Sequence, residues 1–169
     1  MATYYLDSSA LLKRYRTEPG TEVVRELIGN SSPDDVFITS LLTTLEIEAS
    51  VVRILKGRVI TEDAYHVLLG RLTQDVRDVL ALYPVTSVTI QRAVEITRRH
   101  GLRAGDAIHL ATALQSLSWR GELLATQDRA IVLVTSDREL LTAASRERQL
   151  IALDPQAVDA MEQVRLLRQ

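Results

Sequence analysis

Residues 130–134 read Ala-Ile-Val-Leu-Val, and Thr135-Ser136-Asp137 follow them directly. A short aliphatic run rich in β-branched residues and bounded by a turn is typical of a buried strand. Asp137 is well suited to begin a helix that extends to Arg146, because an aspartate carboxylate accepts hydrogen bonds from the first free amides of a helix. The segment therefore predicts a buried strand that leads into a helix, with a carboxylate at the junction.

The same alternation of short apolar strands and helices continues on both sides of this segment. The predicted strands are residues 3–6, 36–38, 130–134 and 150–152, and the predicted helices are residues 10–16, 21–28, 40–56, 61–82, 87–100, 102–117, 135–146 and a last one after Asp154. Strands that alternate with helices in this way indicate a parallel sheet covered on both faces. The predicted fold class is α/β, a three-layer α/β/α domain around a central parallel sheet.

The chain is organised as one domain. Its 169 residues fit a single hydrophobic core, and no internal repeat, low-complexity tract or linker divides them. We expect a single domain over residues 1–169, with a core of about 3–152 and a C-terminal helical extension of about 154–168.

Composition limits the function classes. Without cysteine, disulfides and thiolate metal sites are excluded, and a net charge of −2 gives no support to a broad electrostatic grip on nucleic acid. Asp7 precedes any apolar run long enough for a signal peptide, and residues 130–134 are too few to cross a bilayer. We therefore expect a cytoplasmic protein that does not insert into a membrane.

Four acids are predicted to meet at the carboxyl end of the sheet, where sites in open α/β sheets concentrate. Asp7 and Asp137 follow predicted strands, whereas Asp106 and Glu46 lie near the starts of the helices at 102–117 and 40–56. A cluster of carboxylates is unfavourable unless cations neutralise it. Ligands that are all oxygen suit Mg²⁺ or Mn²⁺ better than zinc.

Each acid also has a simpler interpretation. Asp7 and Asp137 serve equally as helix caps, and Asp106 complements a helix dipole. Glu46 has a rival in Glu48, which falls within the apolar stripe predicted for the 40–56 helix. That stripe consists of Leu41, Leu45, Ala49 and Val52. The residues alone therefore lead to an acidic site for a divalent metal, and the pattern slightly prefers Glu48.

Several motifs together resemble one known family. They are YLDSSAL at 5–11, KRY at 13–15, TTLE at 43–46 with Ala49 and Arg53, LRAGDAIHLATA at 102–113 and VTSDREL at 134–140. In this order they resemble the PIN-domain proteins, in particular the VapC-type toxin ribonucleases, over residues 4 to about 152. The spacing to Arg53 selects Glu46 over Glu48.

The resemblance implies a function and a set of partners. It implies a PIN fold, Mg²⁺ or Mn²⁺ bound by Asp7, Glu46, Asp106 and Asp137, and cleavage of RNA phosphodiesters by metal-activated water. It also implies a homodimer and a small antitoxin protein that blocks the groove. Asp128 competes for the role of fourth acid, but it precedes the strand at 130–134 and is expected at the opposite end of the sheet.

Two other functions compete with this one. The first is a non-catalytic PIN-fold module that binds RNA or acts as a scaffold. The second is a phosphoryl-transfer enzyme with Asp7 as a covalent nucleophile, which is disfavoured because position 9 is Ser and no lysine follows Lys56. The complete set of four acids disfavours the first.

Neighbouring residues receive narrower expectations. His109 lies three residues after Asp106 and is expected to pack or hydrogen-bond beside the site rather than to catalyse. Of Ser8 and Ser9, one is expected to cap a helix and the other to line the site. The arginines that are candidates to guide RNA phosphates are Arg14, Arg16, Arg53 and Arg103, although a solvated charge is the better interpretation of each.

The antitoxin is expected on the helix pair 40–56 and 62–82. Leu68, Leu69 and Leu72 are candidate apolar contacts there, although burial in the protein's own core or in a homodimer is the favoured interpretation of each one.

Overall fold

A parallel sheet of five strands in the order β3-β2-β1-β4-β5 forms the centre of the computed structural model, which describes residues 2–124 and 131–168. The strands are β1 Thr3–Leu6, β2 Val36–Ser40, β3 Leu80–Tyr83, β4 Ile131–Val134 and β5 Leu150–Leu153. All four neighbouring pairs are parallel, and Leu6 lies opposite Val134 in the register of β1 and β4. The central strands β1 and β4 therefore end side by side, at the edge where the predicted acids begin.

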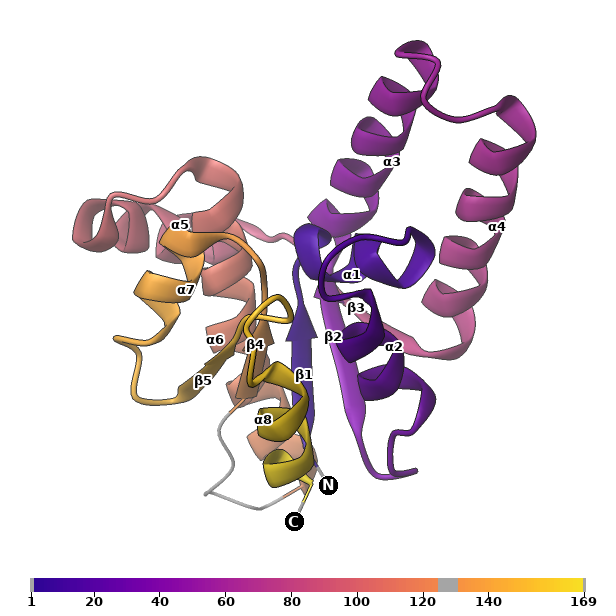
Figure 1. Cartoon of the computed structure of the whole chain (residues 1–169). Helices are drawn as coiled ribbons and strands as arrows, with labels where there is room; N and C mark the ends of the chain where they lie inside the picture. Colours follow the sequence, from indigo (N-terminus) through magenta and orange to yellow (C-terminus); the bar gives the residue numbers. More distant parts are fainter. Residues whose placement is uncertain (1, 125–130, 169) are drawn as a thin grey trace.

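Eight helices in the described residues cover this sheet (Figure 1). They are α1 Ser8–Tyr15, α2 Thr21–Gly29, α3 Leu41–Lys56, α4 Glu62–Asp78, α5 Ser87–His100, α6 Ala104–Leu124, α7 Arg138–Ala144 and α8 Ala160–Leu167. In the described part of the chain, no helix is both long and apolar enough to cross a bilayer.

The two faces of the sheet carry separate cores, because successive strand residues point to opposite faces. Tyr4 and Leu6 pack with α1–α4 and α8, whereas Tyr5 packs with α5–α7. Helices cover both faces, so the strands are mostly apolar. The prediction of a three-layer α/β/α fold with a central parallel sheet is confirmed.

Strand β3 was missed by the sequence prediction. Residues 80–82 were expected to continue the helix that begins after Thr61, but α4 ends at Asp78 and Leu80 pairs with Phe37 of β2. A short apolar run that follows an amphipathic helix has no periodicity of its own to mark the change. The predicted C-terminal helix also begins later than expected, at Ala160.

Helix α3 buries a different side from the one predicted. Thr43, Ile47 and Val51 are buried, whereas Leu41 and Leu45 are exposed, so the predicted stripe is wrong. In Figure 1, α3 and α4 form a hairpin that extends beyond the carboxyl ends of the strands.

The leucines proposed as antitoxin contacts on α4 belong to the protein's own core. Leu68 and Leu72 are buried in the core that α1–α4 share, and Leu69 packs against it. Burial in the protein's own core, the favoured interpretation of these leucines, is therefore confirmed, and the alternative that they contact an antitoxin is not supported.

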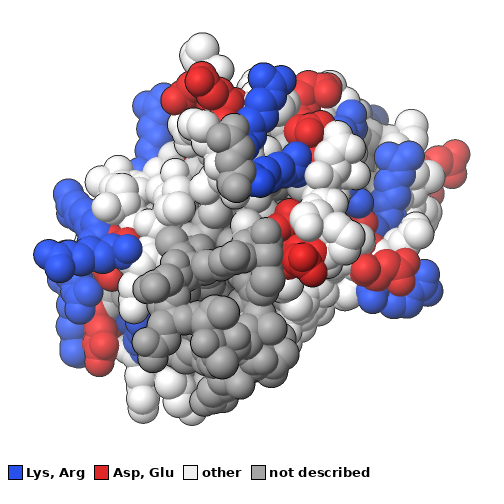
Figure 2. Space-filling model, turned by 90° about the horizontal axis from the view of Figure 1, so that it is seen from below, with Lys and Arg blue, Asp and Glu red and all other residues white. Residues whose placement is uncertain are grey.

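The described part of the surface at the amino ends of the strands carries both basic and acidic side chains. Figure 2 shows this face from below, and its Lys and Arg side chains are interspersed with Asp and Glu in the part drawn in colour. This mixture fits the small net charge of −2.

Candidate active site

Asp7 lies at the junction between β1 and α1, and its side chain is almost fully buried (3% exposed). Its Oδ1 accepts a hydrogen bond from the backbone N of Ala10 at 2.8 Å, so the carboxylate caps α1. Its backbone N donates to the carbonyl of Val134 at 3.3 Å, which ties this junction to the end of β4. The capping role predicted for Asp7 is real, but a cap alone does not require burial.

Two hydroxyl groups hold the Asp7 carboxylate. Thr135 Oγ1 donates to Oδ2 at 2.6 Å, and Ser9 Oγ donates to both carboxylate oxygens at 2.9 and 3.0 Å. Ser9 Oγ accepts in turn from the backbone N of Ser136. Burial raises the pKa of Asp7, while the charge of His109 and the bonds from Thr135, Ala10 and Ser9 act in the opposite direction.

His109 joins the first strand to Glu46. Its ring is 2% exposed, with Nδ1 at 2.9 Å from the hydroxyl of Tyr5 and Nε2 donating to Glu46 Oε2 at 2.8 Å. Burial opposes ionisation of both partners. The hydrogen bond and charge of His109, with a bond from Ser8, nevertheless lower the pKa of Glu46, and the carboxylates nearby raise that of His109.

Glu46 rather than Glu48 faces this site. Glu48 Oε1 accepts a 2.5 Å hydrogen bond from the hydroxyl of Tyr65 on α4, away from the strand ends. Glu46 Oε1 lies only 3.0 Å from where a Cβ at Gly105 would stand, so the first turn of α6 rests directly on this carboxylate. A side chain at position 105 would require the end of the Glu46 side chain to shift by a few tenths of an ångström.

Asp106 lies in the first turn of α6 and is half-buried. Burial raises its pKa to about 6, together with the negative charges of Asp137, Asp7 and Glu46, while His109 acts in the opposite direction. Asp106 therefore lies within the electrostatic field of the other three acids. No hydrogen bond to its carboxylate comes from the residues that the structure describes.

Asp137 is the N-cap of α7. Its Oδ1 accepts hydrogen bonds from the backbone N of Glu139 at 2.8 Å and of Leu140 at 2.9 Å, and its own backbone N donates to Thr135 Oγ1 at 3.0 Å. The Thr135 hydroxyl thus donates a hydrogen bond to Asp7 and accepts one from the backbone of Asp137. Asp128, the competing acid, lies outside the described residues.

The four acids share one region without forming a ready coordination sphere. Within residues 2–124 and 131–168, no three His, Asp or Glu side chains are placed so that they could hold one ion together. Asp7 is engaged by hydroxyl groups and Glu46 by His109. The donor set itself is all oxygen, which fits Mg²⁺ or Mn²⁺.

Sequence reasoning missed the supporting residues rather than the acids. Thr135 and Tyr5 both contact site residues, but a threonine after a strand and a tyrosine within one carry no signal of their own. His109 packs and hydrogen-bonds beside the acids, as expected. Ser9 lines the site, as expected of one of the two serines. The expectation that the other caps a helix is wrong, because Asp7 is the N-cap of α1 and Ser8 bonds to Glu46.

Comparison with known proteins gives consistent matches. A family model described as PIN domain matches residues 4–146. Ribonuclease VapC45 of Mycobacterium tuberculosis (strain CDC 1551 / Oshkosh) is 31% identical over 147 residues, which cover 85% of this chain and 90% of that protein.

Two solved structures share the fold. FitAcB from Neisseria gonorrhoeae superposes with a TM-score of 0.62 at 21% identity, over 90% of this chain and 97% of the other. A toxin–antitoxin complex from Klebsiella pneumoniae gives a TM-score of 0.56 at 16% identity, over 89% of this chain and 96% of the other. Each match covers most of both chains, so the likeness extends over nearly the whole fold.

Proposed function

The chain belongs to the PIN-domain family, and from this we infer that it is an endoribonuclease that acts as the toxin of a toxin–antitoxin pair. One structural observation carries the enzymatic part. Asp7, Glu46, Asp106 and Asp137 come from separate segments near the carboxyl end of the sheet, and burial, together with the negative charges of the other three acids, raises the pKa of Asp106 to about 6. Carboxylates gathered against their mutual repulsion indicate a site for cations.

The proposed cofactor is Mg²⁺ or Mn²⁺, held by Asp106, Asp7, Glu46 and Asp137. When bound, such an ion neutralises the carboxylates, activates a water and stabilises the negative charge that builds up on a phosphodiester. The oxygen-only donor set supports this choice. RNA would lie across the carboxyl ends of β1 and β4, where these acids are grouped.

The chain's own residues orient the acids. Thr135 and Ser9 fix both oxygens of Asp7, and His109 fixes Glu46 while Tyr5 holds the other side of its ring. His109 is therefore a positioning residue. Its Nε2 is occupied by Glu46 and its ring is buried, which removes it from direct contact with RNA.

The proposed antitoxin places a Lys or Arg among the acids. A guanidinium that bridges two carboxylates relieves the same repulsion as a metal ion. Because Leu68 and Leu72 are buried, the accompanying apolar contact falls instead on Leu41 and Leu45 at the start of α3, which are 47% and 64% exposed. They lie one turn apart on the same side of the helix that carries Glu46. The toxin–antitoxin complex that shares the fold supports a partner of this kind.

A homodimer is also proposed, as the resemblance implies. Ile90 and Val94 lie one turn apart on α5 and are 43% and 45% exposed, and with Ile108 of α6 they line an apolar groove. A second copy would bury these side chains. Light scattering of the wild type and of Val94→Asp tests this, with a dimer expected for the first and a monomer for the second. A monomeric wild type excludes it.

The central experiment is cleavage of single-stranded or looped RNA by the purified protein. We expect cutting with Mg²⁺ or Mn²⁺, none with EDTA, and none by Asp7→Asn, which removes a charge at nearly constant shape. Glu48→Gln is the matched control and should cut as fast as the wild type, because Glu48 bonds to Tyr65 instead of facing the site. RNA binding without metal-dependent cleavage would favour the non-catalytic alternative.

A further inference from the structure

A second polar pocket lies between α1, α2 and α4, on the side of the molecule that carries the α3–α4 hairpin (Figure 1). We call it the arginine pocket, and it has a volume of about 320 Å³. Its lining residues are Arg14, Tyr15, Arg25, Arg71, Gln74 and Asp75. None of these residues belongs to the acidic site.

The floor of the arginine pocket is a closed polar network. Asp75 is 7% exposed and accepts two hydrogen bonds from the guanidinium of Arg14, at 2.5 and 2.8 Å, and one from the hydroxyl of Tyr15 at 2.8 Å. The charges of Arg14 and Asp75 cancel each other. Because both are held in place, the floor is rigid and carries no net charge.

The rim of the pocket is positively charged. Arg25 of α2 and Arg71 of α4 are exposed, and neither forms an ion pair with a carboxylate in the described part of the chain. Two guanidinium groups therefore face the same opening without a counter-charge. The pocket rim is therefore locally positive, although the whole chain has a net charge of −2.

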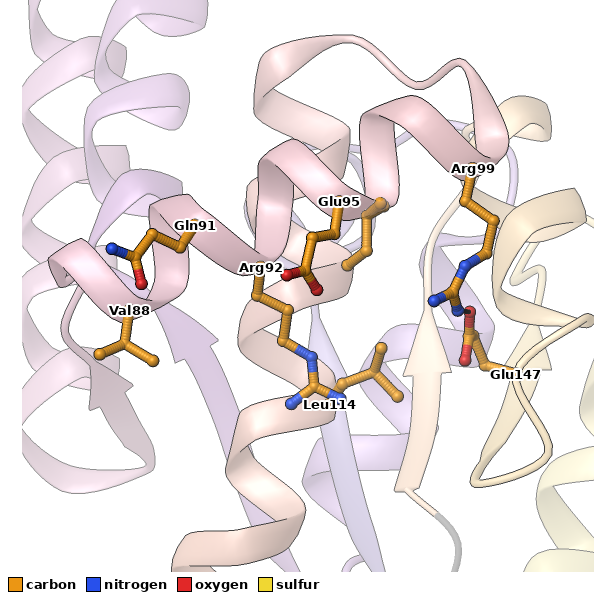
Figure 3. A pocket seen from close by; sticks show the side chains of 8 residues that line it. Val88, Gln91, Arg92, Glu95, Arg99, Leu114 and Glu147 are labelled. Atoms are coloured by element: carbon orange, nitrogen blue, oxygen red, sulfur yellow. Dashed lines mark hydrogen bonds and ion pairs between the residues drawn. The ribbon is translucent and has the colours of Figure 1, made fainter.

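A pocket beside α5, which is also lined by two arginines, lacks this excess. Figure 3 shows Arg92 and Arg99 of α5 beside Glu95 and Glu147, with Arg99 paired to Glu147 at 3.3 Å. Two positive and two negative side chains line it. The arginine pocket is thus a better candidate for an anion than this balanced pocket, in which Arg92 provides a comparison residue.

We propose that the arginine pocket binds a backbone phosphate of the RNA substrate a few nucleotides from the bond that is cut. The proposal rests on the proposed ribonuclease function. Helix α1 connects the two places, because Asp7 caps its start and Arg14 lies near its end. Seven residues of helix span roughly 10 Å. Stacked nucleotides advance roughly 3.4 Å each, so about three of them bridge that distance.

A phosphate fits the pocket better than a protein side chain does. Guanidinium groups bind phosphate oxygens through paired hydrogen bonds, and Arg25 and Arg71 approach the opening from different helices. The lining contains no aliphatic side chain, and Tyr15 turns its hydroxyl to Asp75. A protein segment would find no apolar anchor here, whereas a sugar–phosphate backbone needs none.

The test measures RNA binding and cleavage by Arg25→Ala/Arg71→Ala. Binding of a labelled single-stranded RNA is measured in EDTA at several salt concentrations, and KM and kcat are measured with Mg²⁺. We expect the dissociation constant and KM to rise at least tenfold while kcat stays within about twofold. The slope of log affinity against log salt should fall by roughly 0.7 for each phosphate that the variant no longer neutralises. Arg92→Ala should match the wild type, and Arg25→Lys/Arg71→Lys should retain most of the affinity.

The possible outcomes separate this inference from the proposed function. If the wild type cuts RNA and the double alanine variant matches it in KM and salt slope, the pocket does not bind RNA. If that variant instead loses only its affinity for a protein antitoxin, the pocket belongs to a protein partner and the inference is equally overturned. If the wild type binds RNA through the two arginines but never cuts it, the assignment of the pocket as a phosphate-binding site stands and the ribonuclease function falls. Circular dichroism checks that each variant is folded.

Discussion

Neutralising Asp106 should stabilise the metal-free protein. The carboxyl group has a pKa of about 6 in the fold against 3.8 for the ordinary group, because burial and the charges of Asp137, Asp7 and Glu46 disfavour its ionised form. A shift of about two units corresponds to about 3 kcal/mol. Because the group is only half-buried, solvent screening reduces this to about 1–2 kcal/mol. Asp106→Asn removes the penalty and should raise the melting temperature at pH 7.5 by roughly 2–8 °C.

The pH dependence gives the sign of the effect. Between pH 3.8 and about 6 the folded protein binds more protons at Asp106 than the unfolded chain does, so this residue lowers the stability as the pH rises. The difference between Asp106→Asn and the wild type should therefore shrink at pH 4. Thermal unfolding in EDTA at both pH values measures it, with the exposed loop variant Asp34→Asn as the control. A melting temperature of Asp106→Asn at or below that of the wild type at pH 7.5 would refute the reasoning.

Three further predictions concern the residues that hold the acids. Gly105→Ala should reduce RNA cleavage at least tenfold with little loss of stability, because the new Cβ would stand 3.0 Å from Glu46 Oε1; unchanged cleavage would mean that Glu46 has room to move. Tyr5→Phe should lower the free energy of unfolding by about 1–3 kcal/mol in urea titrations, because it leaves the buried Nδ1 of His109 without a partner, and an unchanged value would assign that bond no role. The raised pKa of His109 gives stability that is present below pH about 6.5 and lost as the pH rises through the higher folded value. Glu46→Gln should weaken that dependence, and an identical pH profile would exclude the coupling.

The parts of the fold that sequence predicts are those with a clear period or boundary. The strand at Ile131–Val134 is an uninterrupted aliphatic run closed by a capping aspartate, and the structure has it. Residues 80–82 lack such a boundary, since the pairing of Leu80 with Phe37 is what makes them a strand. Helix α3 has apolar residues on more than one side, so its buried side depends on where Ile47 packs.

Some features of the site could also be predicted from the sequence, and others could not. The edge of the sheet at which Asp7 and Asp137 lie could be predicted from the sequence. Each acid lies in the short connection between a strand of a parallel sheet and the helix that follows it. The choice between Glu46 and Glu48 could not be predicted from the apolar pattern, since that pattern favoured Glu48 and the contacts with His109 and Tyr65 decide it. Contacts between residues far apart in the chain cannot be predicted from the local sequence pattern.

The central claim is that RNA cleavage depends on a metal ion held by the four acids. The most direct test measures the rate of RNA cleavage while the concentration of free Mn²⁺ is raised from zero in a chelator-buffered series. We predict no cleavage without the ion, a saturable rise for the wild type, and no rise for Asp7→Asn at any concentration despite an intact fold. Cleavage by the wild type at full rate without metal, or by Asp7→Asn at the wild-type rate, would contradict this mechanism.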